Sequence, residues 1–263
     1  MADLAALLDD FAAECADLEN LVAPLSPEQW TTPTPAPRWD IATQIAHLTW
    51  TDEVSVIAAT DAEAFAAFVA EAAPRVLTVV DEGAEDIART PPTDLLVRWR
   101  AGRERLIAAL AAVPAGTKLP WFGPPMSAAS MISARIMETW AHGQDVADAL
   151  GATRTPTARL RTVAHISVRT RNFAYLVNGE SGPAEEFRVE LTAPDGTLWT
   201  WGPEDATQRV TGPAVDFCLI TTQRRHRDDT DLVTEGPDAD HWLGIAQAFA
   251  GPPGAGRAAG QFA

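Results

Sequence analysis

The feature that most constrains the fold is a helical repeat that fills the first 150 residues and then stops. Apolar side chains recur there at steps of three and four residues, which is the pattern of amphipathic helices. Prolines and polar stretches divide the repeat into four long segments, over residues 3–23, 40–73, 93–112 and 127–150. Because each segment carries an apolar stripe that must be buried, the four helices predict a four-helix bundle.

Several residues mark the ends of these helices. Asp40 and Ser127 precede the second and fourth segments, and their side chains favour helix N-caps. Asp61 is expected to cap a continuation of the second segment, and Gly151 is placed to end the fourth. Residues 75–90 are only weakly helical in pattern.

The period of the pattern changes after a fifth helix, which is expected over about residues 157–178. Apolar and polar residues then alternate as they do in strands, and Asp195-Gly196 is a hairpin signal. Three strands and two further helices are expected over residues 187–192, 198–201, 208–211, 213–223 and 241–249. The predicted fold class is therefore α+β, with a bundle over residues 1–152 and a smaller α+β domain over residues 153–263.

The charge balance excludes some classes of partner. The formal net charge is −16, from 20 Lys and Arg against 36 Asp and Glu, whereas nucleic acid and anionic lipid both require a basic surface. The N-terminus is acidic, unlike a signal peptide, and no apolar run is long enough to span a bilayer. Cys15 and Cys218 lie far apart in apolar helical patterns and are expected to be reduced core thiols. We therefore expect a cytoplasmic protein with a small-molecule substrate, no nucleic-acid or membrane partner, and an oligomeric state that the sequence leaves open.

Polar residues on two of the expected helices form a candidate metal site. Glu138 and His142 are four residues apart and lie on one face of the fourth helix, and Asp145 falls on the same stripe. His47 lies on the second helix among apolar residues and needs a polar partner there. One carboxylate and two imidazoles from facing helices suit a divalent transition metal, zinc in particular, and leave coordination positions open.

Other interpretations of these residues remain open at this point. Glu138 and His142 are also consistent with an exposed helical pair. His47 is also consistent with a core histidine that donates to a backbone carbonyl. Spacing alone favours these structural interpretations over a metal site.

Two segments resemble a known family. They are residues 39–48, Trp-Asp-Ile-Ala-Thr-Gln-Ile-Ala-His-Leu, and residues 137–150, which begin Met-Glu-Thr-Trp-Ala-His-Gly-Gln-Asp. Both are similar to the mycothiol-dependent maleylpyruvate isomerase family of the DinB-like metalloenzyme superfamily. The resemblance implies that a histidine on the second helix, a glutamate on the fourth and a histidine one turn later bind zinc. These residues correspond to His47, Glu138 and His142.

The same resemblance carries an expected activity. It covers the bundle well, and the C-terminal region more loosely resembles the sterol-carrier-like α/β domain of the family. It implies a metal-dependent isomerase or S-transferase, in which a metal-activated thiolate of mycothiol, the thiol cosubstrate, adds to a small electrophile that carries a carboxylate. Two alternatives remain, a thiol-independent metal-dependent hydrolase and a non-catalytic protein that binds a small ligand.

Further side chains are candidates for supporting roles. Arg224, Arg225 and Arg227 lie in the run Gln-Arg-Arg-His-Arg-Asp-Asp, and arginine binds carboxylates with two parallel hydrogen bonds. The resemblance implies that an arginine of the C-terminal domain acts in catalysis; the alternative is surface pairing with the adjacent aspartates Asp228, Asp229 and Asp231. Asp145 is expected to orient a ligand imidazole or a bound water, unless it is a solvated carboxylate. Trp121 and Phe122 either wall the mouth of the pocket or pack within their loop.

Overall fold

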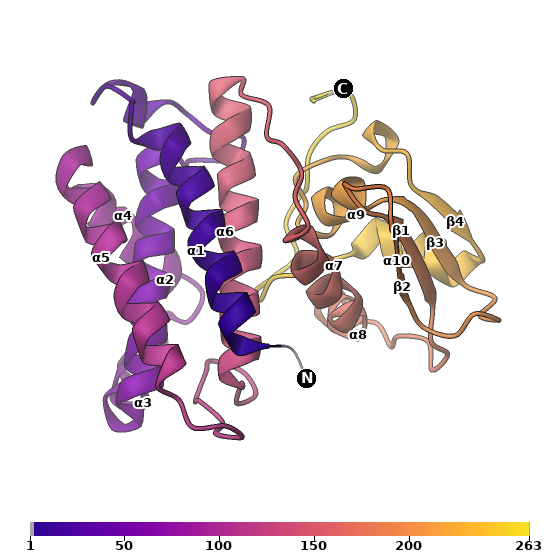
Figure 1. Ribbon diagram of the computed structural model, residues 1–263, viewed down its shortest axis with the longest axis horizontal. Coiled ribbons are helices and arrows are strands. Elements are labelled where there is room, and N and C mark those ends of the chain that lie inside the picture. The colour runs from indigo at the N-terminus through magenta and orange to yellow at the C-terminus, as the bar shows by residue number, and fades with distance from the viewer. Residues whose placement is uncertain (1–2, 263) are drawn as a thin grey trace. The chain divides into compact units, whose positions relative to one another are not determined.

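The structure is a computed structural model that describes residues 3–262. It divides into two compact units, Met1–Thr153 and Arg154–Ala263. The division lies next to the expected one after residue 152. Helices form the first unit, and helices with a sheet form the second (Figure 1).

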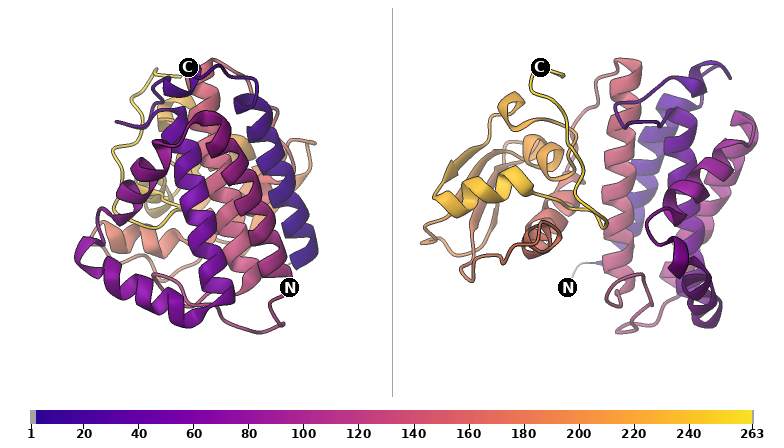
Figure 2. Two further views of the ribbon diagram at one scale, coloured as in Figure 1. Left: turned by 90° about the vertical axis from the view of Figure 1, so that its left-hand side faces the viewer. Right: turned by 180° about the vertical axis from the view of Figure 1, so that it is seen from behind.

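Four long helices of the first unit run side by side, as Figures 1 and 2 show. They are α1 (Leu4–Val22), α2 (Ile41–Thr60), α5 (Pro92–Ala111) and α6 (Ala128–Leu150). Helix α2 packs against both α5 and α6, and α1 packs against α6 and α5. The centre is filled by the apolar stripes that the sequence predicts, including the fully buried Phe11, Ile45, Trp99 and Ile132. The predicted bundle is confirmed.

The ends of these helices follow from local side chains. The Asp40 carboxylate accepts a hydrogen bond from the Thr43 backbone amide at 2.8 Å, and Ser127 caps α6 in the same way. Asp61 caps a separate helix, α3 (Ala62–Ala72), so the predicted second segment is two helices. Gly151 takes a left-handed conformation, φ 63°, and ends α6.

Shorter helical elements complete the first unit. The weakly helical stretch contains α4 (Val79–Ala88), which packs along α2. Two turns of 3-10 helix, η1 (Gln29–Thr31) and η2 (Ala73–Arg75), lie between the longer helices. None of the helices within residues 3–262 has the length and hydropathy to cross a membrane.

The contact between α2 and α4 depends on a glycine. A Cβ atom on Gly83 would overlap the indole of Trp50, which also packs against Phe68 at 6.1 Å between ring centroids. We therefore expect Gly83→Ala to lower the free energy of unfolding by about 1–3 kcal/mol, measured by chemical denaturation. The matched control is Gly102→Ala in α5, where a Cβ meets no atom within 4 Å. That variant should gain about 0.5–1 kcal/mol, since alanine favours helix. Equal effects of the two substitutions would contradict this packing.

The second unit contains a four-stranded sheet in the order β2-β1-β3-β4. Its strands are β1 (Arg188–Thr192), β2 (Leu198–Trp201), β3 (Arg209–Pro213) and β4 (Val233–Glu235). Strands β1 and β2 form the predicted antiparallel hairpin, and Gly196 supplies its positive φ of 82°. Strands β1 and β3 are parallel, and α9 (Ala214–Thr221) packs on both of them.

Several elements of this unit differ from the sequence prediction. The expected helix over 157–178 is two helices, α7 (Leu160–Arg169) and α8 (Arg171–Val177), which separate at Thr170. The Thr170 hydroxyl lies 3.0 Å from the carbonyl oxygens of both Ile166, one turn earlier, and Gln247, so local and tertiary contacts meet at the break. The last helix, α10 (Pro237–Ile245), begins four residues before the expected start, and η3 (Arg227–Asp229) and β4 were not predicted.

Candidate metal centre

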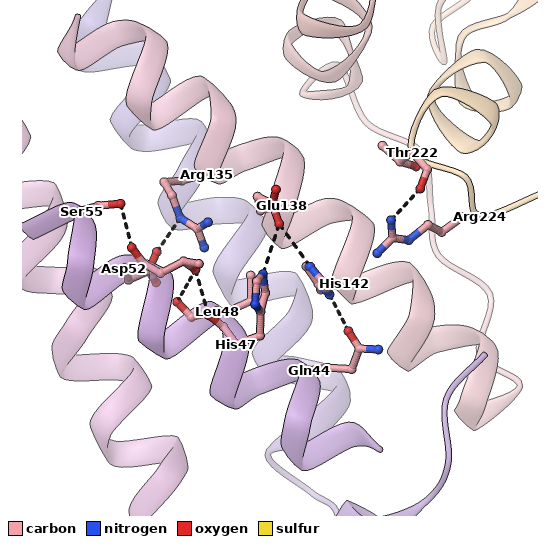
Figure 3. A network of polar contacts seen from close by, with 11 residues as sticks. Gln44, His47, Leu48, Asp52, Ser55, Arg135, Glu138, His142, Thr222 and Arg224 are labelled. Carbon is pink, nitrogen blue, oxygen red and sulfur yellow. Dashed lines mark hydrogen bonds and ion pairs between the residues drawn. The ribbon is translucent and has the colours of Figure 1, made fainter. Parts of the chain in front are cut away.

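Three side chains from two adjacent helices meet in the first unit. His47 comes from α2, and Glu138 and His142 come from α6 (Figure 3). Oε2 of Glu138 lies 3.4 Å from Nε2 of His47 and 3.2 Å from Nε2 of His142. One ligand atom from each residue lies within 4.8 Å of the other two. We call these three residues the triad.

The local structure explains why the triad converges. Glu138 and His142 are one helical turn apart, so both side chains leave the same face of α6. That face packs against α2, and His47 reaches it from the middle of α2. The pairing of two helices therefore brings together residues that are 91 positions apart in the sequence.

The triad is partly accessible and charged. His47 and His142 are 7% and 8% exposed, whereas the side chain of Glu138 is 21% exposed. Burial opposes the ionisation of Glu138, but hydrogen bonds with His142 and His47 outweigh it and hold the pKa of this carboxyl well below its usual range. The site therefore presents an anionic oxygen between two imidazoles.

This donor set fits a divalent transition metal. Two imidazole nitrogens and one carboxylate oxygen form the set that catalytic zinc sites use, and three protein ligands leave room for a further ligand. Within residues 3–262, no second group of three or more potential metal ligands lies this close together. Neither structural alternative from the sequence describes the triad, because both histidines are buried and both face the same glutamate.

Two residues that the sequence reasoning did not single out complete the site. The indole of Trp39 contacts both imidazoles: it stacks on His142 with ring centroids 5.7 Å apart and is tilted to His47 at 5.1 Å. Oε1 of Gln44 lies 2.5 Å from Nδ1 of His142 (Figure 3). Gln44 is three residues before His47 on α2, and this helical spacing is the signal that could have identified it.

Asp145 lies three residues beyond His142 on α6 and is fully buried. The solvated-carboxylate alternative for this residue is therefore wrong. The contact that orients His142 through Nδ1 comes from Gln44. A role for Asp145 in orienting a ligand therefore stays a prediction.

The three predicted arginines lie in the second unit. Arg224 donates to the Thr222 carbonyl oxygen at 2.6 Å, and the Arg225 guanidinium lies 4.4 Å from the centroid of the Phe262 ring. Arg227 pairs with Asp240 at 2.6 Å rather than with the adjacent aspartates. Arg225 and Arg227 line a pocket of about 240 Å³ together with His226 and Arg257. The approach of any of these arginines to the triad stays a prediction.

Trp121 and Phe122 pack on α3. Trp121 stacks on Phe65 with ring centroids 5.9 Å apart, and Phe122 contacts Phe65 and Phe68 through ring edges. These contacts favour the loop-packing interpretation over a role at the pocket mouth.

The two cysteines are buried free thiols, as expected. Burial raises the pKa of both thiols far above the usual range for cysteine, so neither is a nucleophile at neutral pH.

Comparison with known proteins identifies the family. Residues 11–147, more than half of the chain, match the family model described as the mycothiol maleylpyruvate isomerase N-terminal domain. The chain belongs to this family. The matched region contains α2, most of α6 and the whole triad, so the resemblance inferred from the sequence is confirmed. A second family model, described as wyosine base formation, matches residues 183–235 of the second unit.

Relatives and solved structures agree with this membership. An uncharacterized protein found in two strains of Mycobacterium tuberculosis is 55% identical over 257 residues, covering 98% of this chain and 100% of that protein. The fold is similar to the crystal structure of the mycothiol-dependent maleylpyruvate isomerase, with a TM-score of 0.58 at 16% identity. A mutant of that isomerase gives a TM-score of 0.61 at 17% identity. Each match covers 90% of this chain and 95% of the other. The predicted fold class, α+β with a DinB-like bundle, is confirmed.

Proposed function

We propose that this protein is a metal-dependent enzyme that uses mycothiol to isomerise or conjugate a small electrophile carrying a carboxylate. The observation that carries the proposal is the convergence of His47, Glu138 and His142 at a partly accessible point between α2 and α6. Membership of the mycothiol maleylpyruvate isomerase family supports both the thiol and the class of reaction.

The triad would hold the divalent ion, for which we propose zinc. When bound, such an ion would lower the pKa of a coordinated thiol and so make the thiolate available at neutral pH. His47 and His142 contribute neutral nitrogen ligands, and Glu138 contributes a negative charge that offsets part of the charge of the ion. Trp39 stacks on the imidazole of His142 and contacts that of His47 at a tilt.

The chemistry requires a second site for the substrate carboxylate. Addition of the thiolate to an activated double bond forms a carbon–sulfur bond and breaks the π bond. Rotation and expulsion of the same thiolate restore the double bond as an isomer, whereas a proton taken up by the adduct gives a conjugate. We propose that Arg224, Arg225 or Arg227 holds the carboxylate, because an arginine fork matches its geometry. Asp145 is proposed to orient a ligand of the triad. Because Cys15 and Cys218 are free thiols, we propose that the protein works in a reducing compartment, the cytoplasm.

Turnover with and without mycothiol tests this proposal. The purified protein should convert maleylpyruvate or another carboxylate-bearing electrophile only when mycothiol is present, and His47→Ala should abolish that turnover. His241→Ala, which removes an exposed histidine of α10, is the matched control and should retain it. Hydrolysis of esters or amides without the thiol would instead support a metal-dependent hydrolase. Wild-type turnover in His47→Ala would overturn both enzymatic functions.

A further inference from the structure

A chain of buried and half-buried hydrogen bonds ends on the imidazole of His142. Nδ1 of His142 lies 2.5 Å from Oε1 of Gln44, and Nε2 of Gln44 lies 2.8 Å from Oγ1 of Thr34. The Thr34 hydroxyl lies 2.8 Å from the carbonyl oxygen of Trp39. Gln44 is fully buried, so these contacts satisfy both ends of its amide.

The direction of each hydrogen bond follows from the last member of the chain. A carbonyl oxygen accepts and never donates, so the Thr34 hydroxyl must give its only proton to Trp39. Oγ1 of Thr34 then accepts from Gln44, which places the amide NH₂ group on that side. Oε1 of Gln44 must therefore face His142, and Nδ1 of His142 must carry the proton.

We infer that Gln44 is a positioning residue that fixes the tautomer of His142. With the Nδ1 proton held by Gln44, Nε2 is the nitrogen that faces Glu138, 3.2 Å away; it would bind a metal ion there, and without an ion it donates to that carboxylate. Histidine ligands of metals commonly donate their other N–H group in this way, and the partner orients the ring. The use of Nε2 as a ligand rests on the proposed function, whereas the tautomer itself does not.

The chain also joins His142 to the loop before α2. Thr34 accepts from Gln44 and holds the carbonyl of Trp39, and the indole of Trp39 stacks on His142 with 20° between the ring planes. His47 differs, because its Nδ1 is buried without a hydrogen-bond partner among residues 3–262. Gln44 therefore acts on one of the two histidines, and His47 serves as an internal reference.

Nitrogen NMR of the metal-free protein tests the inference directly. Wild-type His142 should show a protonated Nδ1. Gln44→Glu keeps an acceptor and should keep this tautomer. Gln44→Met removes the acceptor and should lower the fraction of His142 that carries a proton on Nδ1, with His47 unchanged. Thr34→Val should also lower the protonation of Nδ1, because without the Thr34 hydroxyl the side-chain amide of Gln44 can rotate by a half turn. This variant provides a second test if Gln44→Met folds poorly.

Zinc affinity supplies an independent measurement. Gln44→Met should weaken zinc binding by roughly 10- to 100-fold, and Gln44→Glu should restore it. Gln29→Met, the same change at an exposed glutamine of η1, should have no effect. An unprotonated Nδ1 in the wild type, or an unchanged protonation of Nδ1 in both Gln44→Met and Thr34→Val, would overturn the inference. If the protonation of Nδ1 depends on Gln44 but the protein binds no zinc, the proposed metal-dependent function is wrong. The role of Gln44 in holding the Nδ1 proton would still be supported.

Discussion

Glu138→Gln is expected to remove tight binding of a divalent ion while leaving the bundle folded. Oε2 of Glu138 is the atom that faces both His47 and His142, and the amide of glutamine is a neutral and weaker ligand of the same size. The loss should exceed the roughly 10- to 100-fold that follows removal of a residue that only supports a ligand. Calorimetric titration of zinc into the metal-free protein measures it.

The control for this variant is Glu104→Gln, which makes the same change on the exposed face of α5. Zinc affinity in Glu104→Gln should equal that of the wild type, and the circular dichroism of both variants should match it. An unchanged zinc affinity in Glu138→Gln would remove Glu138 from the proposed site.

Asp52→Asn is expected to cause the largest loss of stability. Nε of Arg135 on α6 donates to Oδ1 of Asp52 on α2 at 2.8 Å, and the two side chains are 4% and 1% exposed. Burial raises the pKa of Asp52 above its usual range, against the opposing effect of Arg135. The asparagine variant would leave the Arg135 charge buried without its counter-charge, which costs about 3–5 kcal/mol of unfolding free energy. Chemical denaturation measures this loss.

Two variants make this stability prediction specific. Replacing both partners, Asp52→Leu with Arg135→Met, should recover most of the loss, because a well-packed apolar pair avoids the desolvation of both charges. Glu53→Gln breaks a pair with Arg98 on the surface, one residue along α2, and should cost less than about 1 kcal/mol. If Asp52→Asn cost no more than Glu53→Gln, the buried pair would not contribute as described.

The helices of the first unit could be predicted from the sequence because local signals define them. Asp40, Asp61 and Ser127 cap helices in the structure as their positions in the sequence predict, and Gly151 ends α6. These signals act within a few residues, so they survive without tertiary information.

The second unit was less predictable because tertiary contacts determine its elements. Strand β4 is three residues long and is defined by its pairing with β3. The start of α10 is an exception, because the local sequence Gly236-Pro237 marks it and proline favours the first turn of a helix. The parallel pairing of β1 with β3 is non-local and has no counterpart in the alternation of apolar residues.

The candidate site shows the same division between local and non-local information. The spacing of Glu138 and His142 places them on one face of a helix, and this follows from the sequence alone. That His47 faces them follows only from the packing of α2 on α6. Gln44 and Trp39 belong to the site because they contact the imidazoles, and these contacts depend on the same packing and on the loop before α2.

Anomalous X-ray diffraction at a metal absorption edge tests the metal site most directly. Crystals of the full-length protein, purified without chelators, should show a single anomalous peak within coordination distance of Nε2 of His47, Oε2 of Glu138 and Nε2 of His142. The absorption edge that produces the peak identifies the element. A peak elsewhere, or no peak in protein supplied with zinc, would contradict the proposal that these three side chains hold a metal ion.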